Sequence, residues 1–190
     1  MSEAIPGDPT RRASLVRGAA FVVMALGVGA ALSPGLDVPR GAPVIGALLF
    51  GAGAAELFAG NQRHAARAPA MLAGVLTMVA GLLFLTRSAT HFLSALQIVA
   101  GWLALRSATL FVAGRRARGA VRRWTFFAAA MDLLLCAAFV VGLSIANLVV
   151  LLFGPTPAMI ASFAWALAAS FAITAAMLFN IAACIGADDA

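Results

Sequence analysis

Residues 92–114 form an apolar run that is long enough to cross a lipid bilayer, which takes about 20 residues. The run reads FLSALQIVAGWLALRSATLFVAG and carries one charged side chain, Arg106. The next nine residues, RRARGAVRR, contain five arginines. Because arginines beside a membrane span favour its cytoplasmic end, this stretch predicts a membrane-spanning helix that ends in the cytoplasm.

The composition of the whole chain indicates the same environment. Hydrophobic residues make up 63% of the 190 residues and charged residues 11%, whereas soluble domains carry about 25% charged residues. The 13 basic residues are all arginines, and most of them lie in short connections between apolar runs. This placement fits membrane topology and contact with anionic lipid headgroups, and it argues against a nucleic-acid partner. The arginine-rich, lysine-free usage also suggests a bacterial protein.

Six apolar runs predict an all-α fold, a six-helix transmembrane bundle that occupies residues 15–184. Residues 1–14 are polar and contain two prolines, so we expect a disordered N-terminal tail, and residues 185–190 form a second tail. The first run, with arginines before it and small residues after it, also fits a cleavable signal peptide. Its similarity to later runs favours a retained helix. The expected spans are 13–32, 42–60, 68–85, 92–114, 124–143 and 158–183.

The distribution of arginines predicts how these helices are oriented. Ten arginines fall before or at the start of the first span and in the second and fourth connections. Arg40 and Arg87 fall on the opposite side, and Arg106 lies within a span. This asymmetry places both termini in the cytoplasm. For a bacterial protein the membrane would be the cytoplasmic (inner) membrane.

An internal repeat divides the six spans into three related hairpins, at about 13–62, 68–114 and 124–183. The second helix of each hairpin ends in a similar tripeptide, ELF at 56–58, TLF at 109–111 and MLF at 177–179. The third hairpin contains an insertion at 147–158, which could extend the fifth helix, lie at the membrane interface or re-enter the membrane. Its apolar part is a candidate docking segment for a larger membrane complex: Leu148, Val149, Val150, Leu151, Leu152 and Phe153.

Three segments of these repeats carry a resemblance to a known family. They are GALLFGAGAAELFAGNQR at 46–63, LAGVLTMVAGLLFL at 72–85 and VAGWLALRSATLFVAG at 99–114. The chain resembles the HdeD-like acid-resistance membrane proteins, which are built on a short repeat of unknown function. The third hairpin departs from the pattern through its insertion and the missing basic residue after Asn180. The resemblance implies an inner-membrane protein linked to acid stress and supplies no catalytic residues.

Three charged residues lie within the predicted spans, where charges are costly and usually functional. Arg106 and Asp132 each lie eight residues from the cytoplasmic end of their helices, at a depth of about 12 Å. We therefore expect an intramembrane ion pair between them. Glu56 lies only about 6 Å deep and could reach the headgroups or compete for Arg106. The pair could lock two helices together, handle protons or ions, or contact lipid headgroups.

Small residues and one tryptophan suggest how the helices pack and where the bilayer surface lies. Residues of this size at four-residue spacing let helices approach closely, within the protein or between subunits of a homo-oligomer. Trp124 opens the fifth span beside the arginine cluster and predicts an aromatic anchor at the interface. The expected packing residues are Ala47, Gly51 and Ala55 on the second helix, and Gly27 and Ala31 on the first.

The sequence lacks the motifs of common enzyme classes. It contains no nucleophile–base pair, no HExxH and no phosphate-binding glycine loop, and its loops are too short for an enzyme domain. We expect a non-enzymatic protein without a metal or other cofactor. Its role would be in membrane stress response or structure. The alternatives are an accessory subunit of a larger complex and a small-solute or proton pathway through Arg106, Asp132 and Glu56.

Overall fold

The computed structural model describes residues 9–33, 38–63, 66–86, 92–153 and 157–185. These residues form six helices, and no strand occurs among them. Each helix is long and apolar enough to span a membrane. Helices are the expected solution in lipid, because every backbone N–H finds its partner within the segment. The helices are α1 (Pro9–Leu32), α2 (Val38–Asn61), α3 (Arg67–Thr86), α4 (Phe92–Arg116), α5 (Gly119–Phe153) and α6 (Pro157–Ile185).

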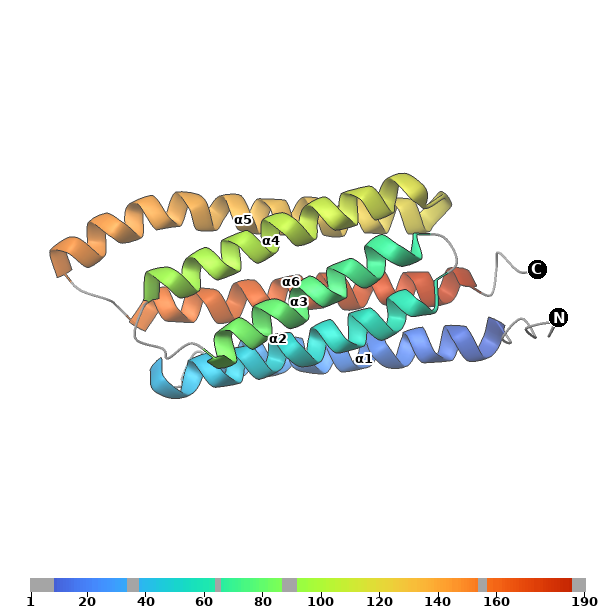
Figure 1. Cartoon of the computed structure of the whole chain (residues 1–190), viewed down its shortest axis with the longest axis horizontal. Helices are drawn as coiled ribbons and strands as arrows, with labels where there is room; N and C mark the ends of the chain where they lie inside the picture. The colour runs from blue at the N-terminus through green and yellow to red at the C-terminus, as the bar shows by residue number, and fades with distance from the viewer. Residues whose placement is uncertain (1–8, 34–37, 64–65, 87–91, 154–156, 186–190) are drawn as a thin grey trace.

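The helices run alongside one another as a bundle (Figure 1). Each helix contacts the next one in the chain, and α6 returns to contact α1, so the contacts close a ring. The start of α1 and the end of α6 lie at the same end of the bundle, together with the α2–α3 and α4–α5 connections (Figure 1). The arginines of residues 115–118 therefore lie at the end of the bundle where α1 begins and α6 ends.

The most extensive contacts do not lie within the three predicted hairpins. They join α2 to α3, α4 to α5 and α1 to α6, each a pair drawn from two different hairpins. The contacts within the hairpins, between α1 and α2, α3 and α4, and α5 and α6, are smaller. The closest packing therefore joins helices that belong to different predicted hairpins.

Glycines explain why α2 and α3 pack so closely. A Cβ atom on Gly53 would lie 2.5 Å from the backbone nitrogen of Met78, and one on Gly74 would lie 2.5 Å from the backbone nitrogen of Leu57. Such distances leave no room for any side chain, so only glycine permits this approach. Gly46, Gly53 and Gly60 recur every seven residues along this face of α2.

The small-residue face predicted on α2 is not its site of closest approach, which is the glycine stripe that faces α3. Ala47 is exposed, and Gly51 and Ala55 are only half-buried. A Cβ atom on Gly51 would meet only the Leu26 side chain of α1, at 3.3 Å. The stripe of α2 that faces α3 is the one with a glycine every seven residues, because a glycine has no Cβ atom to hold the two backbones apart.

The two packing residues predicted on α1, Gly27 and Ala31, differ in what they contact. Gly27 does lie at a close contact, since a Cβ atom there would be 3.2 Å from the Cβ of Phe171 on α6. Ala31, one turn further along, is half-buried.

Two predicted boundaries need correction. Residues 9–14 are helical instead of disordered, because α1 begins at Pro9, and proline fits the first turn of a helix. The fifth helix begins at Gly119 instead of residue 124, and Gly119 itself adopts a φ of 57° that suits glycine. Trp124 therefore lies in the second turn of α5 and does not open it.

The insertion of the third hairpin extends α5. This helix continues without a break to Phe153, over 35 residues. At 1.5 Å per residue it is about 52 Å long, well beyond the roughly 30 Å hydrocarbon core of a bilayer. Its C-terminal end projects past the neighbouring helices (Figure 1). The side chains of the candidate docking segment, residues 148–153, lie outside the described set.

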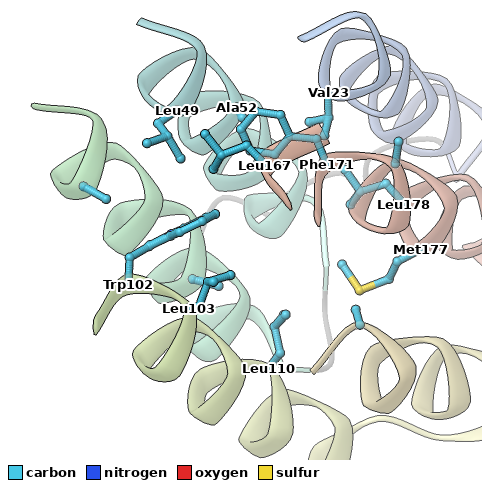
Figure 2. Close-up of a cluster of buried hydrophobic side chains, with 14 of the residues drawn as sticks. Val23, Leu49, Ala52, Trp102, Leu103, Leu110, Leu167, Phe171, Met177 and Leu178 are labelled. Carbon is cyan, nitrogen blue, oxygen red and sulfur yellow. The ribbon is translucent and has the colours of Figure 1, made fainter. Parts of the chain in front are cut away.

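The core is formed by side chains that several helices send toward the middle of the bundle. Figure 2 shows Val23 of α1, Leu49 of α2, Trp102 of α4 and Phe171 of α6 pointing into this space. All four are at most 4% exposed. Large apolar side chains such as Leu105 and Trp165 are more than half exposed on the outer faces, as expected for surfaces that meet lipid tails.

Candidate functional site: a buried charge cluster

Arg106 lies in the interior of the bundle, and both membrane carboxylates bind it. Arg106 is 1% exposed, Asp132 2% and Glu56 6%. They come from three helices, α4, α5 and α2 respectively. Arg106 and Asp132 form an ion pair through Nη1 and Oδ2, as their matched depths predict. Glu56 does not reach out to the headgroups, since its Oε1 lies 2.7 Å from Nη2 of Arg106.

The guanidinium of Arg106 uses every N–H group it has. Nε donates to Oε2 of Glu56 at 3.3 Å, and Nη2 donates to Oε1 of the same carboxylate at 2.7 Å. Nη2 also donates to Oγ1 of Thr174 at 2.7 Å. Nη1 donates to Asp132 and, at 3.4 Å, to Oγ of Ser170. An arginine side chain has five N–H donors, and all five have a protein partner here.

Ser170 and Thr174 bring a fourth helix, α6, into the cluster. The Ser170 hydroxyl donates to Oδ1 of Asp132 at 2.9 Å, and the Thr174 hydroxyl donates to the backbone oxygen of Ser170 at 2.7 Å. Both residues are at most 1% exposed. Neither residue is among the site residues predicted from the sequence. They are separated by four residues, one helical turn, in an otherwise apolar stretch, and that pairing is the signal that could have revealed them.

The repeat offers a second signal for the same two residues. When the tripeptides at 56–58, 109–111 and 177–179 are superimposed, Thr174 falls at the position of Arg106, and Ser170 falls at the position of Trp102. The polar residues of α6 thus occupy the same repeat positions as Arg106 and Trp102 on α4. In the first repeat these positions hold Gly53 and Leu49.

Trp102 connects the cluster to α3. Its indole Nε1 donates to Oγ1 of Thr77 at 3.1 Å, and Thr77 in turn donates to the backbone oxygen of Ala73 at 3.0 Å. The guanidinium carbon of Arg106 lies 5.8 Å from the centre of the indole ring, within the range of a cation–π interaction. One hydrogen bond, from Trp102 to Thr77, thus links α4 to α3 beside the charged residues.

Arg63 is a further cation whose charge interacts with Glu56 of the cluster. It follows α2, and its Nη2 atom is buried without a hydrogen-bond partner among the described residues. Burial lowers the pKa of Arg63 to about 10, and attraction to Glu56 offsets part of this effect. Two carboxylates and one guanidinium would carry a net negative charge, so the positive charge of Arg63 acts to balance Glu56 from the side of the α2–α3 connection.

This arrangement can hold helices at a defined rotation. Glu56, Arg106, Asp132 and the two hydroxyl residues fix α2, α4, α5 and α6 to one another through directional bonds, which apolar packing does not supply. Among the described residues, no group of three or more His, Cys, Asp or Glu side chains lies close enough together to hold a metal ion. Trp124 belongs to a different surface, on the outside of α5, and its indole makes an edge-on contact with the ring of Phe127 at 5.9 Å.

Comparison with known proteins does not assign the chain to a family. No family model matches it, and neither a curated protein nor a solved structure is significantly similar to it.

Proposed function

We propose that this chain is a non-enzymatic, multi-pass inner-membrane protein in which a buried charge cluster sets the arrangement of the helices. Its role is structural or lies in the response of the membrane to stress. Both termini face the cytoplasm. The observation that carries the proposal is that all five N–H groups of the Arg106 guanidinium donate hydrogen bonds to protein atoms.

A transport pathway would need charged groups with free bonding capacity that face water. The cluster has the opposite character, since its three charged residues are at most 6% exposed and are bonded to each other and to two hydroxyl groups. Paired, buried charges of this kind resist rearrangement, because separating them exposes uncompensated charge to a medium of low polarity. This favours a rigid scaffold over a conduit.

The resemblance of residues 46–63, 72–85 and 99–114 to HdeD-like proteins supports the stress role. Survival of a deletion strain after an acid challenge tests it. The strain should survive less well than its parent, and a plasmid-borne wild-type gene should restore survival. Restoration by an Arg106→Gln gene at equal protein level would separate the stress role from the cluster, and unchanged survival of the deletion strain would reject the stress role.

A role as an accessory subunit predicts a different result in purification. The wild-type chain should be isolated from native membranes in a mild detergent, and every chain that accompanies it identified by mass spectrometry. A lone monomer or homo-oligomer supports the proposal. Stoichiometric partner chains would instead identify a subunit of a larger complex, with the projecting end of α5 as the first surface to examine.

Proton handling is the second candidate, because two carboxylates face one guanidinium. An Asp132→Asn variant removes one of these carboxylates with little change in volume. Helix packing, followed by tryptophan fluorescence at acidic and neutral pH, should then differ in its pH response between the variant and the wild type. Identical responses would remove this candidate.

A further inference from the structure

The outer surface of α5 carries a groove at the end of the bundle where the arginines gather. Its volume is about 430 Å³, and Arg123, Trp124 and Phe127 line it. Trp124 is half-buried and its ring packs edge-on against Phe127 at 5.9 Å. An aromatic wall beside a cation is the chemistry found where membrane proteins meet the headgroup layer.

Arg123 is the residue of this groove whose charged group is free to bind a ligand. It is exposed, and the described part of the chain gives it no hydrogen bond or ion pair. The neighbouring Arg122 is different, since its guanidinium lies 5.6 Å from the ring centre of Phe126. Arg123 therefore presents five unused N–H donors in a fork that suits the oxygens of a phosphate group.

An apolar stripe leads from the groove along α5 toward the middle of the membrane. Phe127, Leu134 and Val141 are 50%, 60% and 61% exposed. Their seven-residue spacing keeps them on one face of the helix. The surface thus offers a cation at the level of the headgroups, an aromatic ring below it and an extended apolar track below that.

We propose that this surface is a specific site for an anionic phospholipid, with the phosphate on Arg123, the glycerol region beside Trp124 and an acyl chain along Phe127, Leu134 and Val141. The occupant follows from charge and shape together. Five arginines within residues 115–123 attract anionic headgroups to this end of the bundle, and the apolar stripe accommodates a chain that a free ion lacks. The site is independent of the buried cluster and of the role proposed for it.

Lipid binding by the purified full-length chain tests this site. Native mass spectrometry in a mild detergent should follow titrations with phosphatidylglycerol and with phosphatidylcholine of the same acyl chains. The wild type should prefer phosphatidylglycerol. Arg123→Gln should weaken phosphatidylglycerol binding about tenfold, equivalent to about 1.4 kcal/mol. It should weaken phosphatidylcholine binding less, because the choline cation already offsets the attraction between that lipid's phosphate and Arg123.

Arg115→Gln is the matched control, because it removes the same charge from an exposed residue of the same arginine cluster that does not line the groove. It should leave the preference for phosphatidylglycerol nearly unchanged. Equal losses in the two variants would show only diffuse attraction to the arginines and would overturn the proposal. Displacement of the lipid by inorganic phosphate alone would also overturn it, because the site would then recognise an ion and not a lipid.

Discussion

Replacing Arg106 with glutamine should be among the most destabilising single substitutions in this protein. It removes all five hydrogen bonds of the guanidinium and leaves Glu56 and Asp132 facing each other without a cation. Five bonds at the average of about 0.6 kcal/mol measured between membrane helices amount to about 3 kcal/mol. Loss of one partner of a buried ion pair independently suggests about 3–5 kcal/mol. We therefore expect the free energy of unfolding to fall by about 3–5 kcal/mol.

Equilibrium unfolding in mixed micelles, with increasing SDS and circular dichroism as the signal, measures this difference. The informative control is the triple variant Glu56→Gln/Arg106→Gln/Asp132→Asn, which removes every charge and keeps the side-chain volumes similar. It should recover most of the lost stability, because buried pairs replaced as a unit leave no unpaired charge. If the single variant unfolds like the wild type, or the triple variant is no more stable than the single one, the reasoning about the cluster is refuted.

Three further perturbations test other parts of the structure by the same titration. Gly53→Ala should destabilise the protein by about 1–3 kcal/mol through overpacking, whereas Gly101→Ala, on an open helix surface, should be neutral or stabilising by up to about 1 kcal/mol; equal effects would contradict the glycine contact. Trp102→Phe keeps the ring packing but removes the donor to Thr77 and should cost about 1 kcal/mol; unchanged stability would show that this bond is unimportant. Burial lowers the pKa of Arg63 to about 10, so the unfolded chain binds more protons than the folded one above that pH. The stability of the wild type relative to Arg63→Gln should therefore rise with pH from about 10 upward. A stability difference that stays constant between pH 8 and pH 11 would contradict the burial of this charge.

The residues of the cluster illustrate how far the sequence could be interpreted. Arg106 and Asp132 could be paired from sequence because charges inside a membrane need partners and helix rise gives their depths. For Glu56 the sequence allowed contact either with the headgroups or with Arg106, since the depth of a residue does not determine how its helix is rotated. Ser170 and Thr174 were missed, because neutral hydroxyl groups in a membrane helix bond easily to their own backbone and are not costly enough to require an external partner.

The glycines show a similar limit. Several small-residue spacings coexist on α2, and the four-residue face at Ala47, Gly51 and Ala55 was the one predicted to pack closely. The structure instead uses the seven-residue face that contains Gly53, because α3 presents Gly74 opposite it. A small-residue stripe becomes a close contact only when a complementary backbone lies across from it, and that depends on both helices.

The sequence by itself determined the six membrane-length helices found among the described residues, and it placed Arg106 and Asp132 at matching depth. Both properties follow from quantities that add up along one helix, namely apolar length and rise per residue. The tertiary structure decided which helices pack most closely, which carboxylates share the guanidinium and which hydroxyl groups complete its bonds. These depend on helix rotation, which is set by the mutual fit of faces from different helices and is not encoded in any one of them.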